Sequence, residues 1–129
     1  MAGELEAVVK AMFEGLDGKD YEAIMRDAAE DIQGVDEISR RWMRGRDALG
    51  EYIGGLLTMV EDVRSELHDV REVLLADTGI VTFWLEQDYT LEGSRQHVSA
   101  PSTVVLRRDR DGWKVVLFHS IPLPEEATG

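Results

Sequence analysis

The sequence contains no cysteine, so a disulfide framework, a thiolate nucleophile and a thiolate metal site are excluded. It also lacks any run of about 18 apolar residues, the length that a membrane-spanning helix needs. The segment Met1 to Glu4 has neither the basic nor the apolar part of a secretion signal. We therefore expect a cytoplasmic protein with no membrane partner.

Basic residues are scarce. The chain has 14 Lys and Arg against 26 Asp and Glu, a formal net charge of −12. Phosphate backbones would be repelled at long range, so we expect no nucleic acid partner. The three histidines show neither His-x-x-x-His nor His-Glu-x-x-His spacing, and no strand, glycine-rich turn and helix follow one another as in a phosphate loop. We expect no metal and no cofactor.

The length and the apolar content predict one folded domain. The chain has 129 residues, of which 43% are hydrophobic, and this size leaves little room for a second core. We interpret residues 1–129 as a single domain, with a frayed tail over residues 124–129.

The N-terminal half predicts three helices, because apolar residues recur there at three- and four-residue spacing. The first helix begins near Leu5 and ends at Gly18, and Asp20 can cap the second. The third begins near Asp47 and carries apolar residues as far as Val60. A short strand is possible between the second and third helices.

The C-terminal half alternates with a period of about two, which predicts strands near 63–76, 80–92, 95–108 and 113–121. Short turns join them, so neighbouring strands should be antiparallel. The sequence thus predicts an α+β fold, a cone-shaped domain with three N-terminal helices packed on a strongly curved antiparallel sheet.

The predicted strand 80–92 is apolar on both sides. Ile80 and Trp84 alternate with Val81 and Phe83, so one apolar face is left after the helices cover the other. We expect a second copy of the chain to cover it, giving a homodimer through the outer face of the sheet.

Three segments carry a family resemblance. Ala7 to Asp36 resembles the N-terminus of ketosteroid isomerases, Gly45-Arg46-Asp47-Ala48-Leu49 is a common pattern of SnoaL-like proteins, and Trp113 to Ser120 is similar to the last strand of small SnoaL-like proteins. In their order and spacing, they resemble the nuclear-transport-factor-2-like superfamily. This superfamily includes ketosteroid isomerases, SnoaL-like polyketide cyclases and the association domain of calcium/calmodulin-dependent kinase. The resemblance implies a cystatin-like α+β barrel with a small-molecule pocket.

The same resemblance implies a reaction and its residues. Asp36 falls where isomerases carry their catalytic aspartate, which implies a base for proton transfer on an apolar carbonyl or polyketide-like ligand. The two hydrogen-bond donors of such a site fall at Met12, which cannot donate, and at Thr103, which can. Pro101 stands where small SnoaL-like proteins often have an arginine. The alternative is a non-catalytic ligand-binding or dimerisation module of the same fold.

Strand alternation extends the candidate site. If Thr103 faces the cavity, then Pro101 and His97 face it too, and His97 becomes a candidate ligand-binding residue. The alternative is a solvated histidine at the rim of the sheet near Gly93. The direction of His119 stays open: facing inward it could act as a general acid or base, and facing outward it would belong to a subunit interface.

The predicted cavity is mostly apolar, lined by Met12, Phe13 and, on the last strand, Phe118, and it should bind a flat hydrophobic molecule. Trp42 either closes the mouth over the ligand or packs in the core. An Asp36 buried beside Met12 would lack strong donors, so its replacement by Asn should stabilise the domain. The enzyme hypothesis requires Asp36, Thr103 and one histidine to share one cavity.

Overall fold

The computed structural model describes residues 3–124. The predicted frayed tail therefore lies outside the described residues, except for Pro124. No helix within residues 3–124 is long and apolar enough to cross a membrane. The elements in chain order are α1 (Glu4–Asp17), α2 (Tyr21–Met25), β1 (Ala28–Asp36), β2 (Met43–Arg44), α3 (Arg46–Met59), β3 (Val60–Leu75), β4 (Thr78–Leu91), β5 (Ser94–Asp109) and β6 (Gly112–Ser120).

The helix boundaries follow the predicted signals. The backbone N–H of Gly18 donates to the Glu14 carbonyl at 2.9 Å and ends α1. The Asp20 side chain accepts from the backbone N–H of Ala23 at 3.1 Å and so caps α2. α2 is only five residues long and ends at Met25. It is shorter than its apolar pattern suggests because Ala28 already pairs with β6.

The four long strands form a meander whose turns lie where the sequence places them. Glu92 and Gly93 both have positive φ, the backbone of the tight hairpin turn between β4 and β5. This turn fixes the register of the hairpin, in which Tyr89 lies opposite Gln96. Antiparallel pairing continues from β3 through β6, so the predicted meander is confirmed.

The sheet as a whole is mixed, with the strand order β2-β1-β6-β5-β4-β3. The predicted antiparallel strands are joined by one parallel pair that the sequence did not predict, because β1 runs parallel to β6. Short turns constrain only strands that follow each other along the chain, and β1 and β6 are far apart in the sequence. Their pairing brings Asp36 beside Ser120 and Gly34 beside Phe118.

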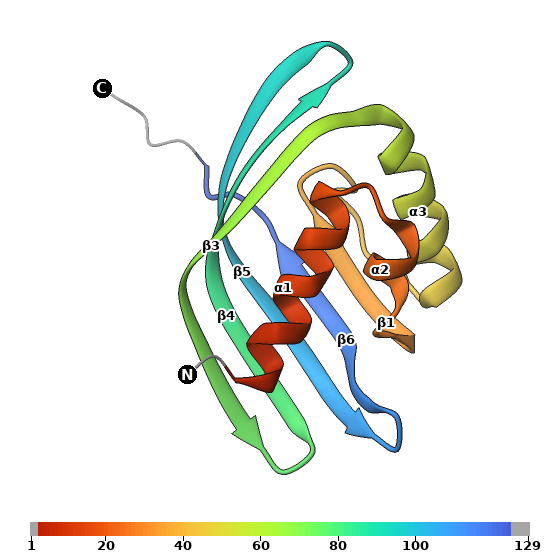
Figure 1. Cartoon of the computed structure of the whole chain (residues 1–129), viewed down its shortest axis with the longest axis vertical. Helices are drawn as coiled ribbons and strands as arrows, with labels where there is room; N and C mark the ends of the chain where they lie inside the picture. The colour runs from red at the N-terminus through yellow and green to blue at the C-terminus, as the bar shows by residue number, and fades with distance from the viewer. Residues whose placement is uncertain (1–2, 125–129) are drawn as a thin grey trace.

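The helices cover the concave side of the sheet. α1 crosses in front of the sheet and contacts β3 and β4, while α3 stands next to β1 (Figure 1). β3 bends strongly through two irregularities in its pairing with β4, and Asp62 and Asp69 have positive φ there. The predicted curvature is therefore confirmed, and its physical cause is the pair of irregular positions on β3.

The core lies between the helices and the concave face. Val81, Phe83 and Leu85 of β4 are buried there together with Leu5 and Val9 of α1, and the alternate residues of β4 face outward. The rings of Phe13 and Phe83 pack edge to face, with the ring centroids 5.8 Å apart. This packing holds α1 against the centre of the sheet.

Gly34 allows the Phe118 ring to lie directly over β1. A Cβ atom at position 34 would overlap that ring. We expect Gly34→Ala to lower the free energy of unfolding by about 1–3 kcal/mol, because either the ring or the strand must move. The measurement is urea unfolding followed by circular dichroism.

Gly54→Ala is the matched control. Gly54 lies in α3, and nothing lies within 4 Å of the Cβ atom that alanine would add. Alanine should stabilise this helix by about 0.5–1 kcal/mol. Equal stability of Gly34→Ala and the wild type would show that Phe118 does not need the space at Gly34.

Candidate functional site

A cavity of about 110 Å³ lies between the concave face of the sheet and the helices. Its wall is mostly apolar, and its polar residues include two neighbouring carboxylates at the end of β1. The lining residues are Met12, Phe13, Leu16, Ile24, Ala28, Ile32, Asp36, Glu37, Ile38, Leu49, Ile53, Leu56, Val60, Val63, Leu85, Gln87, Tyr89, Val98, Val115, Phe118 and Ser120. We call Asp36, Glu37, Gln87, Tyr89 and Ser120 the polar end of the cavity.

Asp36 is held by a turn that follows β1. Its Oδ1 atom accepts hydrogen bonds from the backbone N–H groups of Ile38 at 3.0 Å and Ser39 at 2.8 Å. The Tyr52 hydroxyl from α3 donates to the same carboxylate, 2.9 Å from each oxygen. The premise that Asp36 lacks donors is therefore wrong, because the turn amides and a helix on the opposite wall supply them.

A second carboxylate and phenol form a similar pair. The Tyr89 hydroxyl, on β4, donates to Glu37 Oε1 at 2.6 Å. Burial raises the pKa of Tyr52 above its usual range, and the nearby Asp36 charge and hydrogen bond raise it further. Burial and the hydrogen bond to Glu37 likewise raise the pKa of Tyr89. Both phenols therefore keep their protons at neutral pH.

The tyrosines were missed in the sequence for different reasons. Tyr89 has the same parity as Val81, Phe83 and Leu85, so strand alternation alone would have placed it on the concave side. Tyr52 lies outside the predicted apolar stripe of its helix, and no spacing relates a helix residue to a turn 16 positions earlier. Only the tertiary packing of α3 on β1 brings Tyr52 to Asp36.

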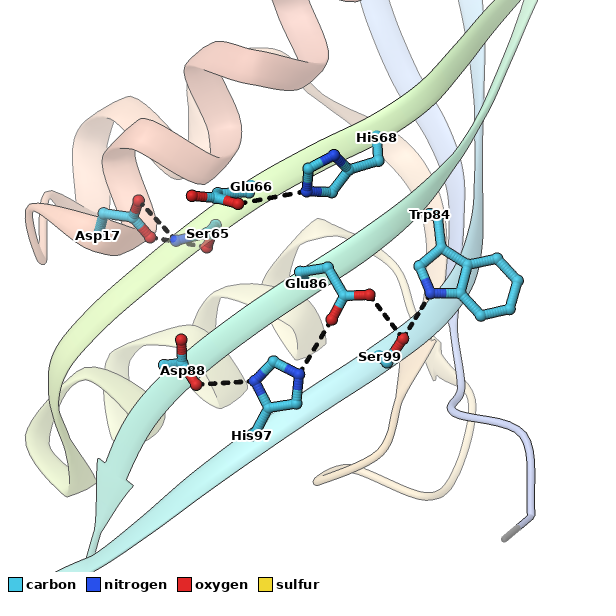
Figure 2. Close-up of polar contacts among 9 residues, drawn as sticks. All are labelled: Asp17, Ser65, Glu66, His68, Trp84, Glu86, Asp88, His97 and Ser99. Atoms are coloured by element: carbon cyan, nitrogen blue, oxygen red, sulfur yellow. Dashed lines mark hydrogen bonds and ion pairs between the residues drawn. The ribbon is translucent and has the colours of Figure 1, made fainter. Parts of the chain in front are cut away.

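Two more polar groups of the wall are fixed by hydrogen bonds. The Gln87 amide nitrogen donates to Ser65 Oγ at 2.9 Å, and the Ser65 hydroxyl donates to Asp17 at 2.7 Å. Figure 2 shows the last of these contacts, which joins β3 to the end of α1. The hydroxyls of Ser120 and Ser102 lie 2.8 Å apart on neighbouring strands.

The structure brings four of the nine predicted site residues to the cavity: Asp36, Met12, Phe13 and Phe118. Thr103 and Pro101 do not line it, because Ser102 and Val104 are the buried, inward residues of β5. The expectation that Thr103 faces inward is wrong by one position. A one-residue offset reverses the side of every residue on a strand, so the same error moves His97 to the outer face.

His97 lies in a polar cluster on that outer face (Figure 2). Its Nδ1 is 2.7 Å from Asp88, and its Nε2 is 3.0 Å from Glu86. The hydrogen bond to Asp88, followed by the Asp88 charge and the contact with Glu86, raises the pKa of His97, although partial desolvation opposes the shift. The two carboxylates hold this exposed imidazole at the rim, as the solvated alternative predicted.

His119 and Trp42 also lie away from the cavity wall. His119 pairs with Thr103 across β5 and β6, so it shares the outer face. The rings of Trp42 and His119 are tilted, with centroids 6.3 Å apart. Trp42 is 42% exposed, so neither the predicted core position nor the predicted place over the cavity mouth is correct. Asp36, Thr103 and a histidine consequently do not share one cavity.

Within residues 3–124, no three His, Asp or Glu side chains are placed to hold a metal ion. The ionisable groups at the polar end of the cavity are the carboxylates of Asp36 and Glu37 and the phenol of Tyr89, and the phenol of Tyr52 is paired with Asp36.

Because Asp36 has donors, its replacement should destabilise the domain. In Asp36→Asn the remaining carbonyl oxygen can still accept from the turn, but the charged acceptor for Tyr52 is lost, at a cost of about 1 kcal/mol. Urea unfolding of Asp36→Asn, Tyr52→Phe and the double variant measures this cost. The double variant should be less destabilised than the sum of the two single variants. A more stable Asp36→Asn protein would contradict the hydrogen bonding described above.

Comparison with known proteins gives the family. The SnoaL-like domain model matches residues 9–118. No curated protein matches the sequence.

Three solved structures illustrate the likeness in fold. A candidate dehydratase of the nuclear-transport-factor-2-like family from Streptomyces avermitilis has a TM-score of 0.86 and 20% identity, over 95% of this chain and 96% of that chain. A ketosteroid isomerase-like protein from Erwinia carotovora atroseptica has a TM-score of 0.78 and 20% identity, over 93% of this chain and 94% of that chain. A protein with a cystatin-like fold from Caulobacter vibrioides has a TM-score of 0.82 and 19% identity, over 95% of this chain and 89% of that chain. These identities show a shared fold, and because the domain match spans most of the sequence, the chain belongs to the SnoaL-like domain family.

Proposed function

We propose that this protein binds a small, mainly apolar molecule in its cavity, with the polar end orienting the ligand. One observation carries the proposal: a mostly apolar cavity wall with polar groups that include two neighbouring carboxylates. This combination is typical of ligand sites, in which apolar contacts contribute affinity and a few polar groups set the orientation. The wider fold family commonly binds small molecules, which supports the proposal.

The size of the cavity limits the ligand. Cavities of about 150 Å³ in apolar protein cores hold one benzene molecule. At about 110 Å³ this cavity is smaller. In proportion, the bound part of the ligand has about four to five non-hydrogen atoms. A flat polyketide or steroid enters only if the cavity widens, so a compact ligand fits better.

The proton-transfer hypothesis keeps its base, Asp36, but not the shared cavity with Thr103 and one histidine that it requires. Asp36 lines the cavity, and its Oδ2 atom accepts a hydrogen bond from Tyr52, whereas Oδ1 also accepts from the turn. A proton on a ligand carbon could therefore move to Oδ2. Thr103 and His119 were expected to donate to the developing oxyanion but face away from the cavity. This is why binding without catalysis is the better supported function.

We also propose that two copies associate through the outer face of the sheet. Apolar and neutral side chains form rows across its central strands, where Trp84 lies opposite Pro101 and Thr103 opposite His119. Trp84 is 37% exposed. The residues of these rows carry no carboxylate, so a second copy meets the least local repulsion there, with Glu86 and Asp88 lying beside the rows. A second copy of this chain is therefore the partner that this surface fits.

Sedimentation equilibrium tests the dimer. We expect about twice the chain mass of 14.5 kDa at micromolar concentration for the wild type. Trp84→Glu should give a single chain, because the new charge would be desolvated against its counterpart. Leu74→Glu is the control, since Leu74 is exposed on β3 at a position that pairs with Gly79, away from Trp84. A monomeric wild type would refute the interface.

Titration with isopentanol, followed by methyl NMR, tests binding in the cavity. Saturable shifts are expected at Leu56 and Val98 of the wall. Ala28→Leu should remove them, because three added carbons fill part of the space next to this lining residue. Ala48→Leu, on the exposed side of α3, should leave binding unchanged. Shifts that persist in Ala28→Leu, or no shifts in the wild type, would contradict the proposed function.

A further inference from the structure

The charged side chains that line the cavity among the described residues are acidic. Within residues 3–124, its lining includes two acids, Asp36 and Glu37, and no Lys, Arg or His. Both acids follow one another at the end of β1 and are only partly buried. An anionic ligand would therefore be repelled at the polar end, where no cation is present to balance its charge.

The hydroxyl protons of the two tyrosines are already used. Tyr52 donates to Asp36 and Tyr89 donates to Glu37, and each phenol has a single proton. Since both phenols stay protonated, the carboxylates remain acceptors and the phenol oxygens can offer only lone pairs. A ligand that contacts these pairs therefore contacts hydrogen-bond acceptors.

Ser120 also offers an acceptor. Its Oγ lies 2.8 Å from Ser102 Oγ, a contact in which either hydroxyl can donate, and the Ser102 hydroxyl also lies 3.2 Å from the Ala100 carbonyl oxygen. Ser120 Oγ is left with lone pairs. Gln87 donates one of its two amide hydrogens to Ser65, which leaves its carbonyl oxygen and the other hydrogen for a ligand. Carboxylate, phenol, hydroxyl and amide oxygens therefore all present acceptors at this end.

We propose that the cavity selects a compact organic ammonium ion, a primary amine on a short branched alkyl chain. This inference rests on the proposed function and adds the chemical class of the ligand. An ammonium group has three donor hydrogens and a positive charge, which match the acceptors and the two carboxylates of the polar end. Its alkyl chain would lie against apolar wall residues such as Leu56 and Phe118. Pairing with two carboxylates offsets the cost of taking the ammonium out of water.

Four ligands of similar shape test this class: isopentylamine, isopentanol, isohexane and isovalerate. Each is titrated into the full chain at neutral pH and low salt, and Kd is measured from the methyl shifts of the cavity wall. The amine should bind roughly tenfold more tightly than the alcohol, since hydrogen bonds to charged groups are the stronger ones. Isovalerate should bind most weakly, because its negative charge is repelled by the carboxylates of Asp36 and Glu37.

Glu37→Gln separates charge from shape. It removes one carboxylate and should weaken binding of the amine roughly tenfold, while isopentanol changes by less than about twofold. Glu30→Gln is the matched control, because Glu30 is exposed on the same strand and does not line the cavity. Circular dichroism confirms that both variants are folded.

The outcomes distinguish the two proposals. If the alcohol and the alkane bind in the cavity and the amine binds no more tightly than they do, the selectivity for ammonium is refuted and the proposed function stands. The selectivity is also refuted, again without loss of the proposed function, if Glu37→Gln and Glu30→Gln weaken the amine equally. If none of the four ligands shifts the cavity wall, the proposed function is refuted, and the selectivity for ammonium with it.

Discussion

The hydrogen bond from Tyr52 to Asp36 joins the end of β1 to α3, and the cavity depends on it. β1 enters the sheet by parallel pairing with β6, and its antiparallel pairing with β2 joins Gln33 and Gly34 to that strand but not Asp36. The turn amides of Ile38 and Ser39 and the phenol of Tyr52 fix the Asp36 carboxylate instead. Glu37 and Tyr89 repeat the arrangement toward β4. These two pairs close the polar end and determine what it can offer to a ligand.

The same pairs explain why the site differs from the expected catalytic site. An oxyanion needs donors in the cavity, and here the phenols donate to carboxylates of the protein itself. The side chains that were expected to donate lie behind the sheet. The chain therefore keeps the fold of the family, while the acceptors at the polar end of the cavity favour a ligand with hydrogen-bond donors.

Local patterns predicted most of the fold. Apolar spacing located the helices, and the hairpin turns located the strands, because both depend on neighbours in the chain. The parallel pairing of β1 with β6 and the partnership of Tyr52 with Asp36 depend on long-range packing that no local pattern contains. The prediction of which β5 residues face the cavity was wrong because it started from Thr103. Strand alternation then gave the same wrong face to Pro101 and His97. The position of Asp36 was found because a resemblance over residues 7–36 contains no gap.

The most direct test of this account is tyrosine ring NMR, with ¹³Cζ labelling, from neutral pH to about pH 11. Because the folded-state pKa of Tyr52 and Tyr89 is raised, the native protein keeps two protons that the unfolded chain loses near pH 10. The account predicts that both signals stay at their protonated positions while the domain remains folded, and that stability falls as the pH rises above about 10. If either tyrosine ionised in the folded protein with a midpoint near 10, the carboxylate and phenol pairs would not be formed.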